Sequence, residues 1–75
     1  MTLVECEKNK TVKIAELLEM DFKLKVRLCE IGFFVGSKVK VLKCSKTQKT
    51  MLVQVLDSCF VIKRDIAKFI KVEYE

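Results

Sequence analysis

Short, largely apolar stretches, several of them alternating with polar residues, recur along the chain. They cover residues 11–14, 38–43, 51–56, 59–62 and 69–74. Successive side chains of a strand point to opposite faces of a sheet, so this pattern predicts strands with one buried face. The inward positions of these strands, together with two apolar residues of the segment before residue 32, predict the core. The candidates are Val12, Ile14, Leu28, Ile31, Val39, Val41, Val53, Val55, Ile62, Ile70 and Val72.

Polar segments between these stretches predict tight turns. Residues 7–10 contain Asn9, which tolerates left-handed backbone angles well, and residues 45–50 form a polar hairpin loop. Residues 57–58, an aspartate and a serine, are a two-residue turn signal, and residues 64–68 have the character of one short helical turn. Five short strands joined by tight turns in 75 residues predict a mainly β protein, a small and strongly bent barrel.

Residues 22–28 fit two different structures. Their apolar and basic residues alternate strictly, which favours a strand. Apolar residues also recur at the helical spacing of i, i+4 and i+7, at Leu24, Leu28 and Ile31. Asp21 is a suitable N-cap residue, and Gly32 is a suitable residue for the position after a helix end. The pattern alone leaves both alternatives open.

Length and composition limit the size and setting of the fold. A chain of 75 residues has room for one core, so we expect a single domain over residues 1–75. Hydrophobic residues make up 51% and charged residues 33%, as in a folded domain with a polar surface. No apolar run approaches the ~20 residues that cross a bilayer, and Glu5 interrupts the start before a signal peptide develops. We expect a cytoplasmic domain without membrane insertion.

The residue types argue against catalysis. The chain contains no histidine, which is the commonest general base near neutral pH and the commonest imidazole metal ligand. Its ten acidic residues are scattered without an obvious pairing. We therefore expect a protein that is not an enzyme, with no catalytic residues and no cofactor-binding residues.

The cysteines do not form a recognisable metal motif. They stand at Cys6, Cys29, Cys44 and Cys59, and no two are close enough in sequence to form a C-x₂-C pair. Zinc sites use such pairs because two ligands on one tight turn pre-form half of the tetrahedron. Thiols in the cytosol stay reduced. We expect four free thiols, at buried or half-exposed positions, and no metal site.

The positive charge is weak evidence for a nucleic-acid partner. The net charge is +5, but lysine supplies most of the positive residues, and arginine is the better residue for bidentate recognition of bases and phosphates. The lysines also alternate with apolar residues, as on the solvated face of a strand. We expect no specific nucleic-acid binding.

Two segments in the correct order carry a family resemblance. Residues 27–33 read RLCEIGF and residues 36–41 read GSKVKV. Together they resemble the R-L-x-x-L-G-[LF]-x-x-G-x-x-[IV]-x-V signature of the FeoA family, small cytoplasmic accessory proteins of bacterial ferrous-iron uptake. Residues 60–72 resemble the family's C-terminal ending, and residues 3–14 resemble its first strand pair more loosely. Val35 stands where the family usually has proline, and Asn9 where glycine is common.

The resemblance implies a fold and a function. The fold is an SH3-like β-barrel of about five strands with an inserted α-helix at about residues 22–31, which resolves the ambiguous segment in favour of a helix. The function is a non-enzymatic accessory module that binds the cytoplasmic GTP-binding domain of a FeoB-type membrane iron transporter and modulates transport. Transition-metal binding is associated with the family name, but the residue types above do not favour tight iron binding by this chain.

Alternatives to that function remain open. One is a regulatory partner of an iron-dependent transcriptional repressor, since such repressors carry a related SH3-like domain. A less favoured one is a basic nucleic-acid-binding barrel, which needs exposed stacking aromatic residues along a basic groove. A homo-oligomer is compatible with all three.

Five residues are singled out around the signature. Gly32 and Gly36 are expected to serve backbone turns. Phe33 and Phe34 are adjacent aromatic residues that cannot easily both face one small core, so one of them is a candidate for an exposed contact. The alternative, slightly favoured, is that both are partly buried against the helix. The candidate partner-binding residues are Arg27, Phe33 and Phe34.

Overall fold

A computed structural model describes residues 1–44, 47 and 49–75 of the chain. The elements follow one another as β1 (Thr11–Leu17), α1 (Phe22–Glu30), β2 (Lys38–Cys44), β3 (Thr50–Val55), β4 (Ser58–Lys63), α2 (Arg64–Ala67) and β5 (Ile70–Tyr74). All five predicted strands are present, with bounds that differ by up to three residues from those predicted. The polar loop predicted at residues 45–50 includes residues 45, 46 and 48, which lie outside the described residues.

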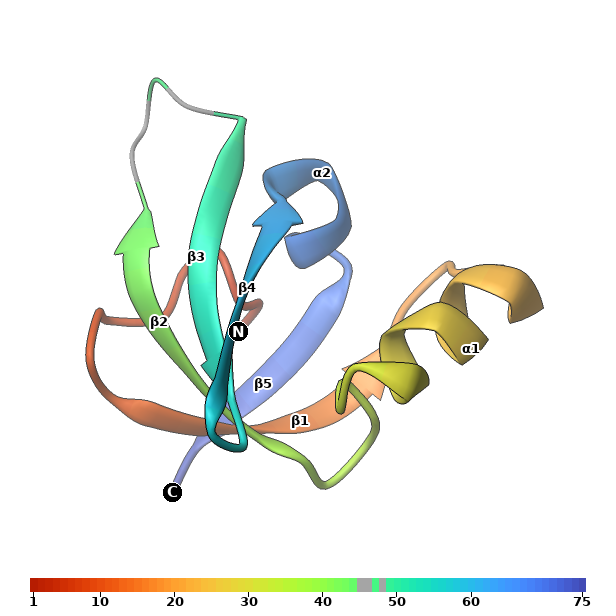
Figure 1. The fold of residues 1–75 in the computed structure, drawn as a ribbon, viewed down its shortest axis with the longest axis horizontal. Coiled ribbons are helices and arrows are strands. Elements are labelled where there is room, and N and C mark those ends of the chain that lie inside the picture. Colours follow the sequence, from red (N-terminus) through yellow and green to blue (C-terminus); the bar gives the residue numbers. More distant parts are fainter. Residues whose placement is uncertain (45–46, 48) are drawn as a thin grey trace.

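The strands form one antiparallel sheet in the order β4-β3-β2-β1-β5, which curls around a common core (Figure 1). Two register irregularities bend it, one in β1 between Ile14 and Glu16 and one in β2 between Val41 and Lys43. A β-bulge of this kind bends its strand and increases the local twist. The mainly β, strongly bent barrel predicted from the sequence is confirmed.

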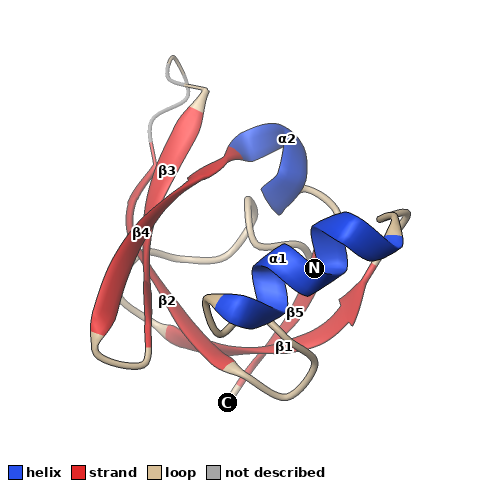
Figure 2. Cartoon of the chain, turned by 45° about the vertical axis from the view of Figure 1, so that its right-hand side comes forward, coloured by secondary structure: helices blue, strands red, loops and turns tan. Residues whose placement is uncertain are grey.

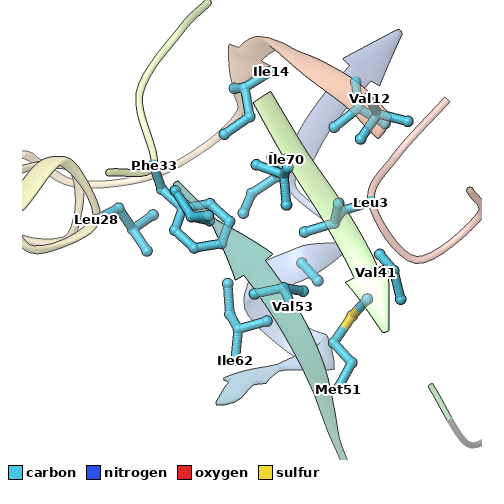
Figure 3. Packing of buried hydrophobic residues seen from close by; sticks show 14 residues of the cluster. Leu3, Val12, Ile14, Leu28, Phe33, Val41, Met51, Val53, Ile62 and Ile70 are labelled. Carbon is cyan, nitrogen blue, oxygen red and sulfur yellow. The ribbon is translucent and has the colours of Figure 1, made fainter. Parts of the chain in front are cut away.

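The core lies inside the curled sheet and is closed at one side by the end of α1 (Figure 3). Every predicted core residue is buried except Ile31, which is half-buried because it caps the C-terminus of α1 at the rim. Four further apolar residues complete the buried cluster, namely Leu3, Phe33, Met51 and Ala67.

Local interactions fix both ends of α1. The Asp21 side chain accepts a hydrogen bond from the Leu24 N–H at 2.8 Å, so it caps the N-terminus as the sequence indicated. At the other end, the N–H of Gly32 donates to the Cys29 carbonyl (3.1 Å), and the N–H of Phe33 donates to the Leu28 carbonyl (2.7 Å). These two bonds define a Schellman motif with Gly32 at φ +100°. The segment is a helix, one residue shorter than predicted.

Two of the predicted turns have different outcomes. Asn9 has a φ of 64°, in the left-handed region, as the sequence analysis predicted from the tolerance of asparagine for these angles. The turn between β3 and β4 consists of Leu56 and Asp57 rather than residues 57–58, because Val55 already pairs with Ser58. The prediction was wrong by one residue, since it followed the polar residues and not the strand register.

No helix within the described part of the chain is long and apolar enough to cross a membrane. The helix α1 lies beside the strands and leaves most of its surface exposed (Figure 2). Its one buried residue is Leu28, which joins the core next to Phe33.

Candidate functional site

The loop from Gly32 to β2 is held in one shape by a dense set of hydrogen bonds. The buried Ser37 hydroxyl donates to the Gly32 carbonyl at 2.6 Å, and the Ser37 N–H donates to the Phe34 carbonyl at 2.9 Å. The Gly36 N–H donates to the Ile14 carbonyl at 2.8 Å, which ties the loop to β1. A loop fixed in this way presents its exposed side chains without the entropy loss of ordering on binding.

The turn at residues 34–37 explains both Gly36 and the residue before it. Gly36 has a φ of +95° at the third position of a turn closed by the bond from Ser37 to Phe34. Positive φ at that position is the mark of a type II turn, in which proline is common at the second position. Val35 occupies the second position, where the FeoA signature usually has proline.

The structure separates the two adjacent phenylalanines. Phe33 follows Gly32 in the Schellman motif and is completely buried, with its ring beside Leu28 (Figure 3). Phe34 is 46% exposed. Phe33 therefore has no surface to offer a partner, and of the two aromatic candidates only Phe34 lies on the outside.

Leu56 is the functional candidate that the sequence reasoning missed. It is 77% exposed and has a φ of 56° in the two-residue turn between β3 and β4. A positive φ at the first central residue, and not at the second, is the pattern of a type II′ turn, where glycine is the usual residue. A leucine there is both strained and unburied, and such strain accumulates at functional positions.

Phe34 and Leu56 stand together between two surface hollows. Both residues line a hollow of about 530 Å³ that also includes Lys38, Lys40 and Gln54 from β2 and β3. Both also line a second hollow of about 540 Å³, whose far wall is the C-terminal end of α1 and Phe60. We call Phe34 and Leu56 the apolar ridge. One flank of the ridge is basic, and the other flank lies against the helix.

Arg27 lies on the exposed surface of α1, in its last turn. Its charge is favourably placed beside the negative end of the helix dipole. Arg27 does not line either hollow beside the apolar ridge. The structure thus brings Phe34 to a potential contact surface and leaves Arg27 outside it, while Gly32 and Gly36 serve the backbone.

The four cysteines do not all gather at one place. Cys29 and Cys59 are exposed, while Cys6 and Cys44 are half-buried. Burial raises the pKa of the Cys6 thiol, and Cys44 lies near enough to contribute to the raised pKa. The Cys6 Sγ also donates to the Leu3 carbonyl, so this thiol stays protonated near neutral pH. Among residues 1–44, 47 and 49–75, no three Cys, Asp or Glu side chains gather as they would around a metal ion. The donor set of the described residues does not fit a metal centre.

The strain at Leu56 has a measurable consequence. We expect Leu56→Gly to raise the free energy of unfolding by about 0.5–1 kcal/mol, because glycine adopts positive φ freely and the exposed side chain buries little. Urea denaturation followed by circular dichroism measures it. As a matched control, Val61→Gly removes another exposed side chain from the same hairpin at ordinary strand geometry, and it is expected to lower stability by up to ~1 kcal/mol. An equal loss in the free energy of unfolding for Leu56→Gly and Val61→Gly would contradict a strained backbone at Leu56.

Comparisons with solved structures give the same fold. The chain aligns with iron(II) transport protein A from Clostridium thermocellum at a TM-score of 0.86 and 19% identity, over 99% of this chain and 45% of that one. It aligns with zinc-complexed FeoA from Stenotrophomonas maltophilia, described as a prokaryotic SH3 domain protein, at a TM-score of 0.80 and 25% identity, over 97% and 89% of the two chains. The predicted SH3-like barrel is therefore confirmed.

A third structural neighbour is a transcriptional repressor. A manganese-dependent transcriptional repressor aligns at a TM-score of 0.87 and 19% identity, over 100% of this chain and 41% of the repressor. The chain thus spans less than half the length of this protein and of the C. thermocellum protein. No protein with curated annotation matches the sequence. A family model described as the FeoA domain matches residues 1–74, and the chain therefore belongs to the FeoA domain family.

Proposed function

We propose that this protein is a non-enzymatic accessory module of ferrous-iron uptake, which binds the cytoplasmic GTP-binding domain of a FeoB-type transporter and modulates transport. Membership of the FeoA domain family supports the setting. The observation that carries the interaction is the apolar ridge, in which Leu56 is kept exposed in a conformation that favours glycine. A side chain that is held in a strained conformation and is largely exposed in the free protein gains a role if a partner covers it.

The surroundings of the apolar ridge suit a protein partner. The loop that carries Phe34 is already ordered by the hydrogen bonds from Ser37 and Gly36. The two side chains of the ridge are a phenylalanine and a leucine. A buried apolar anchor with a polar rim is the usual arrangement of a binding hot spot. Lys38 and Lys40 lie on one flank and would attract an acidic rim on the partner. The module would favour one conformation of the transporter by binding it more tightly than the other.

The direct test is a titration of labelled protein against the full-length transporter in nanodiscs, without nucleotide, with GDP and with a non-hydrolysable GTP analogue. We expect saturable binding whose affinity depends on the nucleotide. Phe34→Ser and Leu56→Gly are each expected to weaken binding at least about 10-fold, as substitutions in an interface hot spot do. Leu56→Gly is informative because its folded state is expected to be more stable, so weaker binding cannot be ascribed to unfolding.

Phe22→Ser is the matched control for Phe34→Ser. Phe22 is 80% exposed at the start of α1 and lines neither hollow. Its replacement is expected to leave the affinity within about twofold, since exposed residues outside a hot spot contribute little. Absence of binding in every nucleotide state would overturn the partnership. Equal weakening by Phe22→Ser and Phe34→Ser would overturn the assignment of the ridge.

The likeness to manganese-dependent repressors supports a second candidate, a regulatory partner of a metal-dependent repressor. It rests on the shared SH3-like fold alone. In this case the titration partner is the intact repressor dimer with its operator DNA. Binding there, combined with no binding to the transporter, would favour the second candidate over the first.

A further inference from the structure

One edge of the sheet is left open. The edge of β5 is covered by the N-terminal residues, because the Val72 N–H donates to the Met1 carbonyl and the Leu3 N–H donates to the Ile70 carbonyl, both at 2.9 Å. The strand β4 is at the other end of the sheet, and β3 is its only neighbour in the strand order. In the described part of the chain, β4 is therefore the strand with an unpaired outer edge.

The register shows which groups point outward. A two-residue turn links β3 and β4, and Val55 pairs with Ser58 directly beside it. The pair next to such a turn is hydrogen-bonded, and bonding then alternates along the strand. Residues 58, 60 and 62 therefore bond toward β3. Cys59 and Val61 direct their N–H and C=O groups to the open edge, and neither donates a backbone bond elsewhere among the described residues.

The middle of this edge lacks the features that usually protect a strand edge from pairing. Natural edges carry bulges, prolines, charged side chains such as lysine, or inward-pointing charges, and on β4 a lysine stands only at the last position, Lys63. The β3–β4 ladder runs through six consecutive pairs without a bulge, and the chain contains no proline. Val61 is 69% exposed on the outer face of β4, and Cys59 is exposed beside it. The middle of the edge is thus regular and apolar.

We propose that β4 is a dimerisation edge, which pairs antiparallel with β4 of a second copy of this chain around a two-fold axis at Phe60. In this register Cys59 of each copy faces Val61 of the other, so all four outward residues form hydrogen-bonded pairs. The same register places Asp57, the turn residue directly before β4, near Lys63 of the other copy. The two ends of the new ladder therefore carry opposite charges, and its middle carries apolar side chains.

The charges select this register over its neighbours. A residue whose backbone N–H and C=O point to the open edge can pair only with another such residue. The register between the two copies can therefore shift only by two residues at a time, and each such shift moves the two-fold axis by one residue. An axis at Cys59 brings Asp57 opposite Val61, and an axis at Val61 brings Lys63 opposite Cys59. Only the axis at Phe60 pairs the two charged residues. A two-fold interface must be complementary to itself, and this segment meets that requirement.

The occupant is a second copy because the complementarity lies within one segment. The acidic residue Asp57, in the turn directly before β4, and the basic residue Lys63, at the end of β4, stand at opposite ends of one segment, so two antiparallel copies bring unlike charges together at both ends. The net charge of +5 on each copy opposes association, and a strand edge buries little surface. We expect a weak dimer that forms at high protein concentration.

A charge exchange tests the dimer. Sedimentation equilibrium in reducing buffer, from about 10 µM to 1 mM protein, measures the dissociation constant. Asp57→Lys and Lys63→Glu each place like charges opposite one another at both ends of the ladder, and each is expected to weaken association about 10-fold or more. The double variant restores opposite charges with exchanged signs, and its association is expected to recover to within about threefold.

Both substituted side chains are exposed, and circular dichroism confirms folding of each variant. Lys71→Glu, an exposed charge change on β5 with the same change in net charge as Lys63→Glu, is the control and is expected to leave or strengthen association. A monomer at every concentration overturns the proposal. So does association that is insensitive to the single changes, or a double variant that stays as weak as the singles.

Discussion

Replacing Gly32 by alanine is expected to lower the free energy of unfolding by about 3 kcal/mol or more, a large part of the ~5 kcal/mol available to a domain of this size. Two effects add. Gly32 has a φ of +100°, which a residue with a Cβ adopts only under strain. An added Cβ would also lie 2.7 Å from Cγ1 of Val55, a side chain held in the core. Overlap with a packed side chain of this kind costs about 1–3 kcal/mol.

Gly36→Ala separates the two effects. Gly36 has a φ of +95°, but an added Cβ would meet no atom within 4 Å. Its replacement is therefore expected to show the strain alone, about 1–2 kcal/mol. Urea denaturation of the two variants side by side measures both. A Gly36→Ala loss as large as that of Gly32→Ala would show that Val55 contributes nothing to the cost at Gly32.

Replacing Phe33 by alanine is expected to cost about 3–5 kcal/mol, because a fully buried aromatic ring is removed and a cavity remains. Such a loss leaves at most about 2 of the ~5 kcal/mol, so the folded state is only marginally stable at room temperature. The neighbouring Phe34→Ala removes a ring that is half exposed, and the expected loss is about 1 kcal/mol. Thermal unfolding followed by circular dichroism distinguishes the two: Phe34→Ala gives a cooperative transition near that of the parent, and Phe33→Ala gives none or one at a much lower temperature.

The Phe33 result would also decide between two accounts of this position. If Phe33→Leu, which keeps an apolar side chain in the core, folds normally while Phe33→Ala does not, packing explains the position. If Phe33→Ala folds as stably as the parent, then Phe33 is not a core residue and returns as a candidate contact residue.

Features that depend on a few neighbouring residues could be predicted from the sequence. The cap at Asp21 and the turn at Gly32 rest on local side-chain and backbone chemistry, and both are confirmed. The burial of Phe33 was available by the same reasoning. Once Gly32 ends the helix, the next residue commonly packs against the third-last residue of the helix, which is Leu28. Treating Phe33 and Phe34 as equivalent overlooked this.

The position of Leu56 could not be predicted in this way. Whether Leu56 is the last residue of a strand or the first residue of a turn depends on the register between β3 and β4, which the whole sheet determines. The open edge of β4 has the same origin, because an edge is defined by which strands pair and not by the strand's own residues. The apolar ridge and the proposed dimerisation edge both lie on this hairpin.

The covering of β5 by the N-terminal residues has a consequence for how the chain folds during synthesis. Residues 1–3 and the strand β1 both pair with β5, which the ribosome makes some sixty residues later. Residues 1–3 therefore lack their strand partner until β5 has been made, whereas β1 can pair with β2 earlier. Contacts between such distant segments are made late and slowly, since the chain must close a long loop before it gains from them. The buried Leu3 can take its place beside β5 only after β5 has been made.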